Sequence, residues 1–102
     1  MSSLEEENRQ VLHLVQALLG AISSNFRAVS MVVGDMTTIT VLLDHDSADD
    51  REEIDEIEFE FCALQSGPIR VKTIVLVSKT PIYELELPGR RVFLRKESVP
   101  SS

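Results

Sequence analysis

The sequence predicts an α+β fold: a two-layer sandwich in which two helices cover one face of an antiparallel sheet of three to four strands. Two segments carry apolar residues at helical spacing behind a serine that can cap a helix. Three further segments, and a possible fourth, are rich in β-branched residues and follow the order α-β-β-α-β-(β). At 102 residues the chain should form a single domain, residues 1–102, with an ordered core over about residues 4–97.

The first helix is expected over about residues 4–22. Ser3 and Glu6 form a Ser-x-x-Glu capping box, in which the serine oxygen accepts a backbone N–H of the first helical turn. Apolar residues then recur every three or four positions and form one stripe for the core. The members of this stripe are Val11, Leu12, Val15, Leu18, Leu19 and Ile22. The Ser-Ser-Asn sequence at residues 23–25 competes for backbone hydrogen bonds and should end the helix.

A β-hairpin is expected next, from strands at residues 26–33 and 36–43. Gly34-Asp35 between them is a two-residue turn signal, because glycine tolerates the positive φ of the first turn position. In the second strand every other residue is aliphatic, which is the period of a strand with one buried face.

The second helix is expected over about residues 48–64, with Ser47 as its cap and Gly67-Pro68 beyond its end. Its apolar side should contain Ile54, Ile57, Phe61 and Leu64, with Phe59 and Cys62 at the margin. Cys62 has no second cysteine for a disulfide and is expected to be a small buried apolar residue. The opposite side of this helix is almost entirely carboxylate.

The last third of the chain should add a third strand at residues 69–79 and a short edge strand at 91–95. Between them lies a loop at residues 80–89 with an extended piece at 82–87, and residues 98–102 should be a frayed tail. The connection through the second helix is a crossover, and we expect it to place the third strand beside the first. That arrangement would make the sheet antiparallel, with both helices on one face.

The charge of the chain argues for a protein partner. The net charge is −7, and residues 1–68 contain 14 acids against 3 bases. Such a chain repels phosphate, so direct binding to nucleic acid is disfavoured and a basic protein is the better match. No apolar stretch approaches the ~20 residues of a membrane span, and the acidic start lacks the positive charge of an export signal. A cytoplasmic protein with no membrane contact is expected.

No set of residues predicts a catalytic, cofactor or metal site. His13 lies among apolar helix positions and is expected to contribute to core packing rather than act as a base. His45 stands between two aspartates, but neighbours along a strand point to opposite faces. If a calcium loop began at Asp44, Ala48 would occupy a ligand position and Asp49 the position that requires glycine. The chain also lacks a phosphate-binding glycine loop and a G-x-S-x-G motif.

The acidic segment at residues 44–60 is the main candidate site. It contains ten carboxylates and one base, Arg51, so acids four residues apart on the helix repel each other by a few tenths of a kcal/mol per pair. We interpret it as a surface that binds a cationic partner, with a merely solvated surface as the alternative. The expected contact residues are Asp44, Asp46, Asp49, Asp50, Glu52, Glu53, Glu56 and Glu60.

Three stretches of the chain resemble a known family: Leu18–Ser30, Pro88–Glu97 and the acidic helix start Asp49–Glu53. Together they are similar to bacterial immunity proteins of contact-dependent growth inhibition systems, over about residues 4–97. Arg91 departs from the family, in which an aromatic residue is usual. The resemblance implies a cytoplasmic antidote that binds the toxin domain of a contact-delivered effector, often a nuclease, and blocks its active site.

The sequence leaves alternatives open for both the mode of inhibition and the function. The inhibitor can cover the toxin's active site or bind an exosite through Tyr83, Phe93 or the arginines near the C-terminus. A monomer in a 1:1 complex is expected, with no cofactor. A non-catalytic subunit or adaptor of another bacterial complex would share these features, and a pull-down from the native host would distinguish it. A small enzyme is the weaker rival and requires a concave site with converging polar groups.

Overall fold

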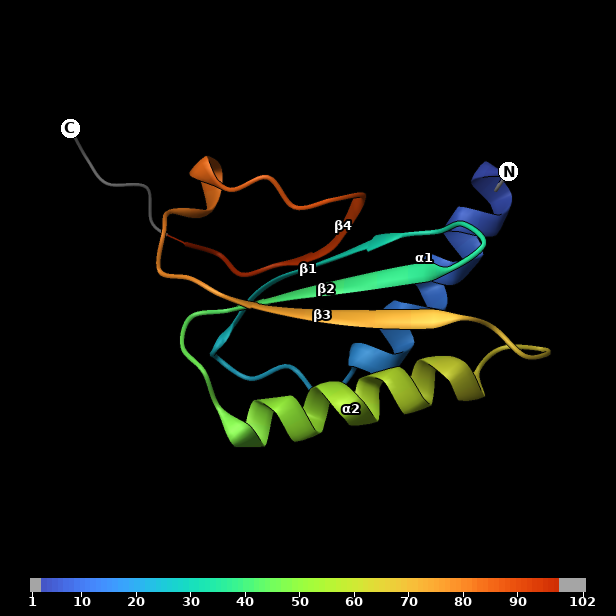
Figure 1. The fold of residues 1–102 in the computed structure, drawn as a ribbon, viewed down its shortest axis with the longest axis horizontal. Helices are drawn as coiled ribbons and strands as arrows, with labels where there is room; N and C mark the ends of the chain where they lie inside the picture. Colours follow the sequence, from blue (N-terminus) through green and yellow to red (C-terminus); the bar gives the residue numbers. More distant parts are fainter. Residues whose placement is uncertain (1–2, 98–102) are drawn as a thin grey trace.

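The computed structural model describes residues 3–97 and confirms the α+β class (Figure 1). The elements are α1 (Leu4–Leu18), β1 (Phe26–Val32), β2 (Thr37–Leu43), α2 (Ala48–Ala63), β3 (Val71–Val77), the 3-10 helix η1 (Ile82–Glu84) and β4 (Arg90–Leu94). Both helices contribute to one core against the same face of the sheet. The single 3-10 turn η1 replaces the extended piece predicted at residues 82–87, and the predicted frayed tail lies outside the described residues.

The strand order β3-β2-β1-β4 corrects the predicted position of the third strand. β1 pairs antiparallel with both β2 and β4, whereas β3 runs parallel to β2, with Thr37 opposite Val71. The third strand therefore does not lie beside the first, and the sheet is mixed rather than antiparallel. The cause is that β4 occupies the free edge of β1, while the crossover through α2 returns the chain to the edge of β2.

The predicted hairpin exists, but its turn differs from the expected one. Residues 33–36 connect β1 to β2, and Gly34 does not have a positive φ. Positive φ values among the described residues occur at Gly20 (82°) and Gly89 (78°). At Gly89 a Cβ would lie 2.1 Å from the Met31 carbonyl oxygen, so glycine is needed for β4 to begin its approach to β1.

The buried face of α1 is rotated relative to the predicted stripe. Its buried residues are Gln10, Leu14, Ala17 and Leu18. Leu12, Val15 and Leu19, which the spacing placed in the core, are instead exposed by 67%, 39% and 74%. The helix ends at Leu18 rather than at residue 22, because Leu19 is extended and the positive φ of Gly20 turns the chain away.

α2 packs as predicted on one side and differs at its margin. Ile54, Ile57 and Phe61 are buried in the core against the sheet. Phe59 is 70% exposed, and Cys62 is exposed rather than buried as expected. Both lie outside the row of Ile54, Ile57 and Phe61 that packs in the core. Partial desolvation, and secondarily the nearby Glu58 carboxylate, raises the pKa of the Cys62 thiol.

A buried ion pair joins β1 to the end of the described chain. The Arg27 guanidinium donates from Nε and Nη2 to the two carboxylate oxygens of Glu97, each at 2.8 Å, and from Nη1 to the carbonyl oxygens of Ser78 and Thr80. Arg95 also donates to Glu97, at 2.7 Å. The Arg27 hydrogen bonds are the main cause that lowers the pKa of Glu97 to about 2.

Candidate functional site

α2 presents a row of carboxylates on the side away from the sheet. The helix begins at Ser47, whose hydroxyl oxygen accepts the Asp50 backbone N–H at 3.2 Å. Ile54, Ile57 and Phe61 face the core, and most acidic residues of the helix lie on other sides and are exposed. Glu58 is the half-buried exception, because it accepts a hydrogen bond from Thr73 Oγ1 on β3 at 2.7 Å. We call the free members of this row the acidic face. It consists of Asp49, Glu52, Glu53, Asp55, Glu56 and Glu60, whose side chains are exposed and have no hydrogen bond or ion pair within residues 3–97.

Asp50 does not belong to this face. It is only 7% exposed, and its carboxylate accepts hydrogen bonds from Ser23 Oγ at 2.8 Å and Asn25 Nδ2 at 2.7 Å. The side-chain amide of Asn25 in turn donates from Nδ2 to the His45 carbonyl oxygen and accepts the His45 backbone N–H at Oδ1. Asp50 therefore fastens the first turn of α2 to the loop before β1 and is unavailable to a partner. The Ser-Ser-Asn signal at residues 23–25, interpreted above only as a helix stop, also supplies these donors.

Asp44 and Asp46 are occupied by cations of the same chain. Lys79 Nζ lies 3.2 Å from Asp44 Oδ2, and Arg95 Nη2 lies 4.0 Å from Asp44 Oδ1. Arg51 Nε donates to Asp46 Oδ1 at 2.7 Å. The hydrogen bond from Lys79 lowers the pKa of Asp44, and that from Arg51 lowers the pKa of Asp46. Their charge is largely balanced within the chain, unlike that of the acidic face.

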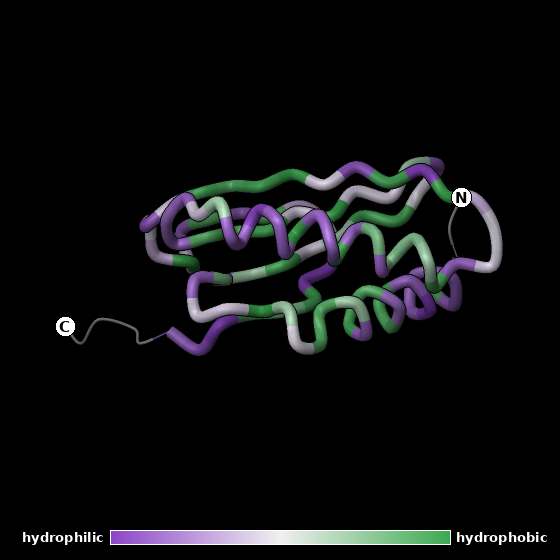
Figure 2. Tube along the Cα trace, turned by 90° about the horizontal axis from the view of Figure 1, so that it is seen from below, coloured by the Kyte–Doolittle hydropathy of each residue, from purple (hydrophilic) through white to green (hydrophobic). Residues whose placement is uncertain are grey.

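A groove of about 610 Å³ separates α1 from α2. Figure 2 views this layer from the α2 side, and hydrophilic and hydrophobic stretches alternate along both helices. Glu52, Glu53, Glu56 and Glu60 line the α2 wall of the groove. The wall formed by α1 and the turn after it is largely apolar or small, with Ala17, Leu19, Gly20 and Ala21 alongside Gln16. Four of the predicted site residues are thus brought together beside an apolar surface that the sequence did not reveal.

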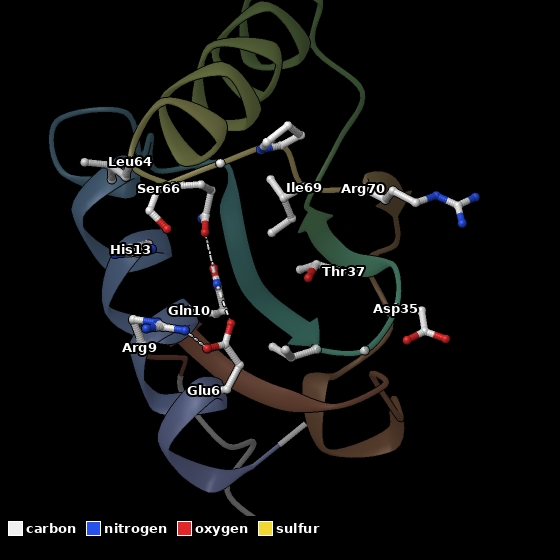
Figure 3. A pocket seen from close by; sticks show the side chains of 15 residues that line it. Glu6, Arg9, Gln10, His13, Asp35, Thr37, Leu64, Ser66, Ile69 and Arg70 are labelled. Atoms are coloured by element: carbon white, nitrogen blue, oxygen red, sulfur yellow. Dashed lines mark hydrogen bonds and ion pairs between the residues drawn. The ribbon is translucent and has the colours of Figure 1, made fainter. Parts of the chain in front are cut away.

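A second cleft, of about 580 Å³, lies between α1, the segment after α2 and the loop from β1 to β2 (Figure 3). Its polar groups bond mainly to each other. The amides of Gln10 and Gln65 exchange two hydrogen bonds, at 3.0 and 2.9 Å, and Gln10 also donates to Glu6. Arg9 forms an ion pair with the same Glu6. His13 lines the cleft, but its Nδ1 is buried without a hydrogen-bond partner.

Neither histidine is placed for general base catalysis. A base must lie within hydrogen-bond reach of the group whose proton it takes. Within residues 3–97 His13 bonds to no hydroxyl, thiol or carboxylate, and exposed His45 approaches only Asp44, at 3.9 Å. No group of three or more histidine, cysteine or acidic side chains in this part of the chain is arranged to hold a metal ion.

No helix within residues 3–97 is both long enough and apolar enough to cross a bilayer. Comparison with curated proteins found no match. Residues 7–97, which are nearly the whole of the chain, match the family of MafI2 immunity proteins. This match confirms the interpretation of the sequence as an immunity protein. The chain belongs to the MafI2 immunity protein family.

Proposed function

We propose that this chain is a cytoplasmic, non-catalytic immunity protein that binds and neutralises a cognate toxin domain in a 1:1 complex. The toxin domain is that of a contact-delivered effector and is a basic nuclease. Family membership supports the role of antidote. The observation that carries the mode of binding is the acidic face of α2, whose six carboxylates form no ion pair within residues 3–97.

The electrostatics favour a nuclease as the target. A nuclease must hold phosphates with a basic cleft, and a row of carboxylates can take the place of those phosphates. Since the charges of Glu52, Glu56 and Glu60 are not neutralised internally, they attract a cationic partner over a distance of about one Debye length, ~10 Å at 0.1 M salt. Such attraction mainly accelerates association, and it weakens as salt increases.

Charge neutralisation on α2 tests this function. The probe is the toxin domain encoded beside the gene for this chain, purified in a catalytically inactive form. The acidic-face variant carries glutamine at four positions: Glu52→Gln, Glu53→Gln, Glu56→Gln and Glu60→Gln. The matched control removes four exposed charges elsewhere: Glu5→Gln, Asp35→Asn, Glu84→Gln and Glu86→Gln. Both variants have the same net charge, so a difference between them reports the place of the charges.

We expect the acidic-face variant to associate at least ten times more slowly at low salt, because electrostatic steering contributes on the order of 10- to 1,000-fold to such rates. The dependence of the rate on salt should also flatten, and cells that express the active toxin should lose protection. The control should behave as the wild type does. If the two variants bind the toxin domain equally well, the acidic face of α2 is not part of the interface. Failure of the wild-type chain to bind this toxin domain would overturn the proposed function.

A further inference from the structure

α1 has a second apolar face, on which Leu12 is 67% and Val15 39% exposed. Leu12 and Val15 lie on one side of the helix, and Leu19, the first residue after the helix, follows them at the end of this apolar row. Leu14 and Leu18 face the sheet instead and are buried. A helix with apolar residues on its outer side as well as its core side typically contacts another molecule.

This outer face adjoins the groove between the helices. Leu19 belongs to both, because it ends the apolar row and also lines the groove. Directly across the groove stand the carboxylates of Glu52, Glu56 and Glu60. Beyond them on α2, Phe59 is exposed and lies one helical turn from Glu56. The helix layer therefore presents an apolar row, an acidic row and an exposed aromatic ring in succession.

The dimensions of the groove limit what can occupy it. A volume of about 610 Å³ can hold a few side chains but not a folded domain. A stable protein interface covers roughly 800 Å² on each partner, so the neighbouring outer faces of both helices must take part. Interfaces commonly place an apolar anchor at the centre and polar groups around it. Leu19 beside the carboxylates of α2 has this arrangement.

From this arrangement we infer that the groove between α1 and α2 holds an amphipathic basic segment of the partner protein. Apolar side chains of that segment pack on Leu19 in the groove and on the neighbouring Leu12, and its lysines or arginines contact Glu52, Glu56 and Glu60. A second copy of this chain fits poorly, because a symmetric contact would bring two carboxylate rows together. The inference rests on the proposed function, since it takes the toxin domain to be the partner and assigns its docking site.

The apolar contribution is tested by single substitutions with matched controls. Leu19→Ser is compared with Leu4→Ser, whose leucine is 68% exposed on the same helix and about 20 Å away along its axis. Phe59→Ser is compared with Tyr83→Ser, whose ring is 65% exposed on the opposite layer of the molecule. The Tyr83 variant also tests the exosite alternative. All four positions are exposed, so unfolding midpoints in urea should stay close to that of the wild type.

The expected result separates apolar from electrostatic contributions by their kinetics. Leu19→Ser and Phe59→Ser should each increase the dissociation rate of the toxin complex at least tenfold and leave the salt dependence of association unchanged. The four-glutamine variant of the acidic face should mainly reduce the association rate. Leu4→Ser and Tyr83→Ser should change both rates by less than about twofold, as expected outside an interface.

Three outcomes would overturn the inference, and each has a distinct pattern. If Leu19→Ser and Phe59→Ser bind as the wild type does while the acidic-face variant is impaired, the groove is not the docking site and the proposed function stands. If the wild-type chain does not bind the toxin domain, the function and the inference both fail. If light scattering shows a wild-type dimer that Leu19→Ser converts to a monomer, this face joins two copies of the chain.

Discussion

The ion pair between Arg27 and Glu97 should make stability depend on pH in a specific way. Arg27 is almost fully buried in β1 and donates to both carboxylate oxygens of Glu97 at 2.8 Å. This pairing is the main cause that lowers the pKa of Glu97 from 4.5 to about 2. The substitution Glu97→Gln removes the carboxylate charge and leaves the buried guanidinium without its counter-ion.

The size of the effect follows from linkage between protonation and folding. At about 1.4 kcal/mol per pKa unit, a decrease from 4.5 to about 2 corresponds to at most ~3.5 kcal/mol of unfolding free energy. Because Glu97 keeps 17% of its side chain exposed and solvent screens the pair, we expect ~2 kcal/mol. Since the folded pKa is the lower one, this stability is fully present above pH 4.5 and disappears as the pH falls towards 2.

Urea unfolding from pH 7 to pH 2 measures this contribution. The unfolding free energy of the wild type should exceed that of Glu97→Gln by ~2 kcal/mol at neutral pH. This difference should shrink between pH 4.5 and pH 2. Glu86→Gln is the control, because Glu86 is exposed and has no hydrogen bond or ion pair within residues 3–97. Its unfolding free energy should follow that of the wild type throughout. A difference between wild type and Glu97→Gln that stays constant across this pH range would refute the assigned role of the carboxylate.

Three further substitutions test the packing of the fold, two by urea unfolding and one by amide exchange. Leu14→Ala should lose about 2 to 5 kcal/mol because it opens a cavity in the core, whereas Leu12→Ala on the exposed side should change stability by less than ~0.5 kcal/mol. Asp50→Ala should cost about 1 to 3 kcal/mol, since it leaves two donors without their acceptor. Gly89→Ala should weaken the pairing of β4 with β1, seen as faster amide exchange there, while Gly67→Ala, with open space around it, should not.

The helix starts and the strand segments followed from local chemistry. Ser3 Oγ accepts the Glu6 backbone N–H at 3.0 Å, and Ser47 caps α2 in the same way, as both Ser-x-x-acid patterns predicted. These interactions involve residues three apart in the chain, so the sequence contains them completely. The alternation along β2 predicted one buried face, and this was wrong, because six of its seven residues are buried and both faces of the strand are covered.

The sequence did not determine which face of α1 packs in the core, because the helix has two apolar rows. One contains Leu14 and Leu18, and the other contains Leu12, Val15 and Leu19. Periodicity favours both equally, and only the positions of the sheet and α2 select the first for the core. The position of β3 beside β2 was undetermined for a similar reason, since the crossover allows either edge until β4 occupies one of them.

For the acidic segment at residues 44–60, some properties follow from the sequence and others depend on the tertiary structure. Composition and the capping serine placed a carboxylate-rich helix at residues 48–64, because charge and local propensity are properties of the chain itself. Which carboxylates remain free is a tertiary property. Asp50 is buried and bonded to Ser23 and Asn25, which lie 27 and 25 positions earlier in the chain. Asp44 is paired with Lys79, which follows the end of β3. The groove that aligns Glu52, Glu56 and Glu60 with an exposed leucine exists only because the sheet holds α1 and α2 side by side.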